Sequence, residues 1–125
     1  MSVSPEGYKV RRELEYQVVP LGTNPRELLE TLGYRETQRI DRFVEYYDVE
    51  SAAIRIEWYP RMDVLIEVEG NPVAIERALR VTGVPRERWR PDPLPVFAAE
   101  YQDRTGVPAV LSLAGLGGEP PAWPR

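Results

Sequence analysis

The chain of 125 residues contains no cysteine and no histidine. It therefore forms no disulfide and has no thiolate nucleophile, and soft-metal sites are excluded with them. The lack of histidine also removes imidazole acid–base chemistry and every nucleophile–histidine pair. Any chemistry must use carboxylates, guanidinium groups, tyrosines and hard cations, so the catalytic residues remain unknown at this stage.

Long apolar runs and an excess of basic charge are also missing. No stretch approaches the roughly 18 apolar residues of a membrane span, and the N-terminus lacks the apolar centre of a signal peptide. We therefore expect a cytoplasmic protein with no membrane partner. The formal net charge of −4 argues against a nucleic-acid partner.

Lysine is almost absent, since Lys9 is the single one among 16 basic residues. Arginine suits bidentate recognition of phosphate, although a bias in coding composition produces the same pattern. Neither a Gly-x-x-x-x-Gly-Lys phosphate loop nor a Gly-x-Gly-x-x-Gly fingerprint occurs. Arginine usage alone therefore does not identify a ligand.

Four alternating segments predict strands, and two capped segments predict helices. The expected strands are Tyr8–Val19, Thr37–Tyr47, Ala53–Tyr59 and Val64–Glu69. Asn24-Pro25 and Asn71-Pro72 each supply an N-cap and a first helical residue. The expected helices are Pro25–Leu32 and a second one that Gly83 ends, with a third from Val96 to Arg104. Short connections between the last three strands predict an antiparallel meander.

This pattern predicts an α+β fold: a mostly antiparallel sheet of about four strands with two short helices on one face. We expect the helices to cover the apolar side chains of the strands, which are Leu14, Ile54, Ile56, Ile66 and Val68. Eight of the 13 prolines lie between Pro85 and Pro124, and residues 115–125 are expected to be flexible.

Carboxylates gather on the opposite side of the predicted strands. They are Glu13, Glu15, Glu57, Glu67 and Glu69, and the basic residues on related strands are Arg11, Arg42 and Arg55. Carboxylates with arginines among them suit a polyphosphate with its divalent metal. A solvated sheet face with cross-strand ion pairs would give the same spacing, so both interpretations stay open.

Several strings in the same order resemble the C-terminal half of a CYTH domain, the triphosphate tunnel metalloenzyme superfamily. Arg11–Glu15 resembles its opening Arg-x-Glu-x-Glu strand, and Leu28–Tyr34 resembles its helix ending in Leu-Gly-aromatic. Leu65–Gly70 is similar to the Phe-Leu-Glu-Ile-Glu-Gly signature. The resemblance covers about residues 8–106, which implies a CYTH-like half domain at 1–106 and a Pro/Gly-rich tail at 107–125.

In that superfamily, which includes class IV adenylyl cyclases and thiamine triphosphatases, eight antiparallel strands form a tunnel for a metal-bound triphosphate. By position, the resemblance implies that Glu13, Glu15, Glu57, Glu67 and Glu69 bind Mg²⁺ or Mn²⁺. It implies that Arg11, Arg42 and Arg55 bind the phosphates of a triphosphate-containing small molecule or polyphosphate. Hydrolysis or cyclisation would follow.

The chain also departs from the family. The first half of the domain is missing, and Gln17, Val44, Glu57 and Asp63 stand where Lys, a basic residue, Asp and Gly are usual. Four strands cannot close a tunnel. Three alternatives follow: a homodimer that completes the tunnel, an open sheet that serves as a non-catalytic binding or interaction module, or a degenerate relative without activity.

Overall fold

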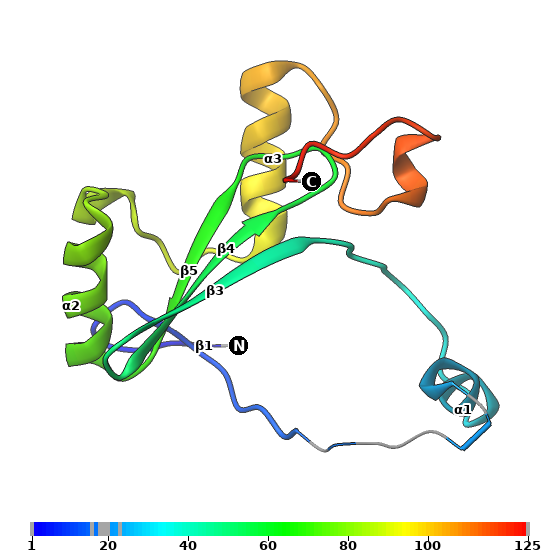
Figure 1. Ribbon diagram of the computed structural model, residues 1–125, viewed down its shortest axis with the longest axis horizontal. Helices are drawn as coiled ribbons and strands as arrows, with labels where there is room; N and C mark the ends of the chain where they lie inside the picture. The colour runs from blue at the N-terminus through cyan, green and yellow to red at the C-terminus, as the bar shows by residue number, and fades with distance from the viewer. Residues whose placement is uncertain (1, 16, 18–20, 23, 125) are drawn as a thin grey trace.

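The computed structural model describes residues 2–15, 17, 21–22 and 24–124. It shows an α+β fold with a three-stranded and a two-stranded antiparallel sheet, and no closed barrel is formed by the described residues (Figure 1). Figure 1 shows two helices at opposite ends of the larger sheet, α2 (Pro72–Thr82) and α3 (Leu94–Thr105).

The larger sheet is the predicted meander, with strand order β3-β4-β5. Its strands are β3 (Phe43–Val49), β4 (Ala52–Trp58) and β5 (Leu65–Glu69), all antiparallel. β-Branched and aromatic residues fill them, as their pleated surfaces favour. β3 begins six residues later than predicted, because residues 37–42 are mostly polar and run past the sheet without pairing as a strand.

α2 (Pro72–Thr82) covers one end of the apolar face of this sheet. It starts as predicted: the Asn71 side chain accepts a hydrogen bond from the backbone N–H of Ala74 at 2.9 Å. Gly83 ends it in the left-handed conformation, with φ of 71°. Ala78 is fully buried against the sheet, and this close approach depends on its small side chain.

α1 (Pro25–Thr31) is also capped as predicted, since the Asn24 side chain accepts from the N–H of Glu27 at 2.9 Å. However, none of its residues is buried, and its apolar stripe stays exposed (Leu28, Leu29 and Leu32). Figure 1 shows α1 far from the larger sheet. It belongs to the segment between β2 and β3, residues 11–42, which we call the arm. Of the two helices expected on the sheet, only α2 therefore covers it.

The first predicted strand is much shorter than Tyr8–Val19. β2 (Lys9–Val10) pairs with β1 (Ser2–Val3) in a small hairpin, and residues 11–15 continue without a strand partner. Tyr16, Val18 and Val19 lie outside the described residues. Leu14, expected under a helix, is 70% exposed. Both sides of this segment carry charge, so it has no apolar face to fix a register on the sheet.

The C-terminal third folds back on the β4–β5 connection. α3 (Leu94–Thr105) is a little longer than the predicted helix and is preceded by the 3-10 turn η1 (Arg86–Arg88). After it, Val110 exchanges two backbone hydrogen bonds with Arg61, at 2.8 and 2.9 Å. The short η2 (Ala114–Leu116) follows.

The tail was expected to be flexible, but it contacts the sheet end. Leu116 is 6% exposed, and the N–H of Ala122 donates to the carbonyl of Pro60 at 2.9 Å. Pro60 is fully buried. The sequence did not reveal this because glycine and proline pairs indicate irregular backbone without saying whether it packs.

The core is small and divided. One cluster joins β4 to α2 through Ala52, Ile54, Ala74 and Ala78. Other buried apolar side chains include Leu79 on α2, Tyr59 and Met62 in the β4–β5 connection, and Leu116 in the C-terminal segment. None of the described helices has the length and apolarity needed to cross a bilayer.

Candidate functional site

The charged face is the side of β4 and β5 that points away from α2. It consists of Arg55, Glu57, Glu67 and Glu69, with Arg42 reaching in from the residue before β3. The alternation of side chains places these residues together. Their register is direct, because Arg55 pairs with Glu67 across the two strands. Of the eight charged residues that the sequence predicted on one face, the structure brings these five together.

Arg55 lies at the centre of the charged face. Its Nη2 is 3.0 Å from Oε2 of Glu67 and 2.5 Å from Oε1 of Glu69. Its Nε lies 3.7 Å from Oε1 of Glu57, too far for a hydrogen bond, and both of these atoms are buried without a hydrogen-bond partner among the described residues. The Arg55 guanidinium therefore lies near three carboxylates but is within hydrogen-bond distance of only two, those of Glu67 and Glu69.

Glu57 is the buried member, with 3% of its surface exposed. Its Oε2 accepts from the Tyr59 hydroxyl at 2.6 Å and lies 3.0 Å from Nη1 of Arg42. Burial and this hydrogen bond raise the pKa of the Tyr59 hydroxyl, which therefore stays protonated. The sequence analysis did not identify Tyr59 as a hydrogen-bond donor to Glu57.

The two carboxylates on β5, Glu67 and Glu69, have opposite pKa shifts. Burial favours the neutral form of Glu67, but Arg55 and hydrogen bonds outweigh it and lower its pKa. For Glu69, burial and its hydrogen bond to Glu67 raise the pKa, and Arg55 only partly compensates. Like-charge crowding therefore persists at Glu69, where an added cation would relieve it.

This crowding predicts a pH effect for Glu69→Gln. Because the folded-state pKa of Glu69 is raised above 4.5, its contribution to stability increases as the pH falls through that pKa. Glu67 behaves oppositely, since a lowered pKa gives stability that is lost on acidification. We expect Glu69→Gln to keep or raise stability at neutral pH and to steepen the loss of stability as the pH falls toward 4.5. Urea unfolding across this range measures the slope, and an unchanged slope would contradict the assignment.

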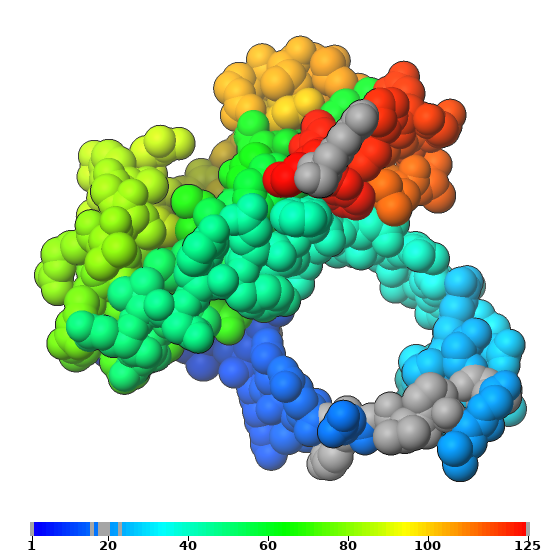
Figure 2. Space-filling view, viewed as in Figure 1, coloured from blue at the N-terminus to red at the C-terminus, as the bar shows by residue number. Residues whose placement is uncertain are grey.

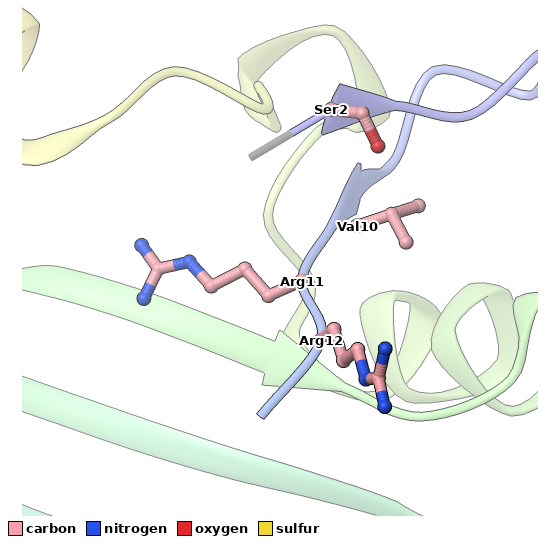
Figure 3. A pocket seen from close by; sticks show the side chains of 4 residues that line it. All are labelled: Ser2, Val10, Arg11 and Arg12. Atoms are coloured by element: carbon pink, nitrogen blue, oxygen red, sulfur yellow. The ribbon is translucent and has the colours of Figure 1, made fainter. Parts of the chain in front are cut away.

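The remaining predicted residues lie on the N-terminal segment. Glu13 is close enough to Glu69 to contribute to its raised pKa, while Glu15 is exposed and joins none of the ion pairs found among the described residues. Arg11 lies beside an open hollow of about 590 Å³ with Ser2, Val10 and Arg12. Figure 3 shows Arg11 and Arg12 pointing to opposite sides of this segment. The structure therefore does not bring Arg11 or Glu15 into the charged face.

The donor chemistry of the charged face suits a hard cation, because its ligands are carboxylate oxygens. The geometry is less suitable, since the Arg55 guanidinium lies between the carboxylates. Within the described parts of the chain, no group of three or more acidic residues is arranged to hold a metal ion. Mg²⁺ or Mn²⁺ would fit only if Arg55 turned toward an anion and left Glu67 and Glu69 free.

Comparison of the chain with protein families, with curated proteins and with solved structures finds no match. The resemblance to CYTH domains therefore depends on the sequence strings alone, and the function has to be argued from the charged face.

Proposed function

We propose that the charged face binds a triphosphate or polyphosphate together with its divalent cation. Glu67 and Glu69 would take Mg²⁺ or Mn²⁺, and Arg42 and Arg55 would take the phosphate oxygens. The observation that carries this proposal is the surplus of carboxylates, since three of them share two guanidinium groups. Burial and the neighbouring Glu67 together raise the pKa of Glu69. A cation with an anion would satisfy both groups of side chains.

The same observation explains how the site would exchange partners. Glu67 and Glu69 are 31% and 53% exposed, and Arg55 is 21% exposed, so each can be reached from solvent. Ion pairs at such positions are individually weak, so a polyphosphate can compete for Arg55 at low cost. Glu57 would stay in place, because it is 3% exposed and its Oε2 accepts a hydrogen bond from the Tyr59 hydroxyl.

A second candidate is a non-catalytic binding or interaction module. It is favoured by the openness of the sheet, because the described strands supply no opposite wall of the kind that a tunnel would have. Activity separates the two. Release of phosphate or pyrophosphate from ATP, thiamine triphosphate or tripolyphosphate with Mg²⁺ or Mn²⁺ would add catalysis to the binding proposed here.

We expect the Glu67→Ala, Glu69→Ala double variant to lose binding of Mn²⁺ with tripolyphosphate by at least about tenfold while remaining folded, since both side chains lie outside the apolar core. Isothermal titration calorimetry measures the affinity, and circular dichroism checks the fold.

The matched control is Glu87→Ala with Glu119→Ala, which removes the same charge from two exposed carboxylates outside the charged face. It should bind as the natural chain does. Equal losses in both variants would mean that net charge, and not a site, governs binding. No binding by the natural chain would overturn the proposal and favour the interaction module.

A further inference from the structure

The outer edge of β3 is an unpaired strand edge in the part of the chain that the structure describes. The sheet order makes β3 an edge strand, and β5 lies at the other side. Val49 and Ala52 flank the two-residue turn of the β3–β4 hairpin, and such a flanking pair exchanges hydrogen bonds. By alternation, the backbone groups of Val44, Tyr46 and Asp48 then point outward.

These outward groups have no hydrogen-bond partner in other segments that the structure describes. No described residue pairs with the backbone N–H groups of residues 44, 46 and 48 on this side. Tyr46 is 71% exposed and Tyr47 is 49% exposed. β3 also lacks the lysine, proline or bulge with which natural proteins block an open edge. Figure 2 shows this strand on the surface, with the arm leaving from its first residues rather than covering it.

We propose that β3 pairs with β3 of a second copy, antiparallel and about a two-fold axis at Tyr46. The sequence of β3 is complementary to itself in this register. Phe43 lies opposite Val49, Val44 opposite Asp48, and Glu45 opposite Tyr47 of the second copy. No two carboxylates oppose each other, and about six backbone hydrogen bonds form.

Neighbouring two-fold registers are less favourable, because they oppose like charges or lose backbone hydrogen bonds. An axis at Glu45 or at Asp48 would place that carboxylate directly opposite itself, which is destabilising. An axis at Tyr47 would leave the outward groups of Val44 opposite the turn residue Glu50, and one pair of hydrogen bonds on each side would be lost. The register at Tyr46 alone uses all seven residues of β3.

The pairing extends the charged face. A two-fold axis perpendicular to the sheet keeps corresponding faces on the same side. The dimer would therefore be a continuous six-stranded sheet, formed from two three-stranded ones, with both charged faces on one side. This arrangement does not depend on metal or phosphate binding, so its test is independent of the proposed function.

The test combines oligomeric state with cross-linking. Sedimentation equilibrium at micromolar concentrations should show a dimer for the natural chain. Tyr46→Pro should raise the dimer Kd by at least about tenfold, since the two central hydrogen bonds lose their donors. Its fold should survive, because this N–H has no partner among the residues that the structure describes and proline is tolerated on edge strands. Tyr46→Val keeps the N–H and should remain dimeric.

Single-cysteine variants test the register, because the chain has no cysteine of its own. Tyr46→Cys should form a disulfide-linked dimer on mild oxidation, since paired Cα atoms in this position lie about 5.5 Å apart. Tyr47→Cys should not, because its equivalent residues are offset. A strictly monomeric natural chain, a folded Tyr46→Pro variant that still dimerises, or preferential cross-linking of Tyr47→Cys would each overturn the proposal.

Discussion

Replacing Glu57 by alanine is expected to lower the free energy of unfolding by about 3 kcal/mol or more. Glu57 is 3% exposed, its Oε2 accepts from the Tyr59 hydroxyl, and the same oxygen lies 3.0 Å from Nη1 of Arg42. Its removal would leave the Tyr59 hydroxyl and the partly buried Arg42 guanidinium without this acceptor. Urea unfolding at neutral pH measures the loss.

Two control variants distinguish the effect of removing a buried carboxylate on the free energy of unfolding from the effect of removing an exposed one. Glu57→Gln keeps an acceptor oxygen for Tyr59, so we expect a smaller loss than for alanine. Glu100→Ala breaks an exposed ion pair with Arg90 and should cost less than about 1 kcal/mol. If Glu57→Ala were as mild as Glu100→Ala, the charged face would not contribute to folding.

Replacing Ile54 by alanine is expected to cost about 3 kcal/mol, the second of the two largest effects. Ile54 is 7% exposed and packs with Ala52, Ala74 and Ala78 in the cluster that joins β4 to α2. Three of these four side chains are alanines, so Ile54 supplies most of the apolar volume. A domain of this kind has roughly 5–15 kcal/mol of stability in total.

Ile66→Ala is the matched control, because it removes the same atoms from a side chain that is 37% exposed on the neighbouring strand. We expect about 1 kcal/mol from it. Thermal unfolding followed by circular dichroism compares the two variants. Equal losses would contradict the placement of the core between α2 and the sheet.

Local signals in the sequence predicted the elements best. The two Asn-Pro caps, Gly83 and the alternation of β4 and β5 depend on neighbouring residues alone, and the structure confirms them. The grouping of Arg55, Glu57 and Glu67 followed from the same alternation. These features carry their information within a few residues, so no partner had to be guessed.

Predictions that needed a distant partner were less successful. The first strand needed a neighbour for residues 11–15, and α1 needed an apolar surface for its leucines. Neither is found among the described residues. The prediction of a flexible tail was wrong for the opposite reason, because a partner is present. The N–H of Ala122 donates to the carbonyl of Pro60, more than sixty residues earlier in the chain. Alternation and capping carry no information about such separations.

The short strand connections and the alternation of charged residues predict two properties of this architecture, an antiparallel meander and a charged face. Neither depends on the resemblance to CYTH domains, which stays a prediction. The meander is present, but the described strands form an open sheet. The metal, the phosphate and the second chain remain proposals, which the binding and dimer experiments above test separately.

The arm that carries α1 closes a long loop, and the entropy of closing that loop depends only weakly on its length. Its two ends are fixed: the Tyr8 hydroxyl donates to Glu76 on α2, and Asp41 bonds to Leu111 and Leu113 in the tail. Halving the length of such a loop would recover only about 0.6 kcal/mol of closure entropy. The fold therefore tolerates a wide range of arm lengths at almost constant stability, which makes this segment the natural place to insert or exchange sequence.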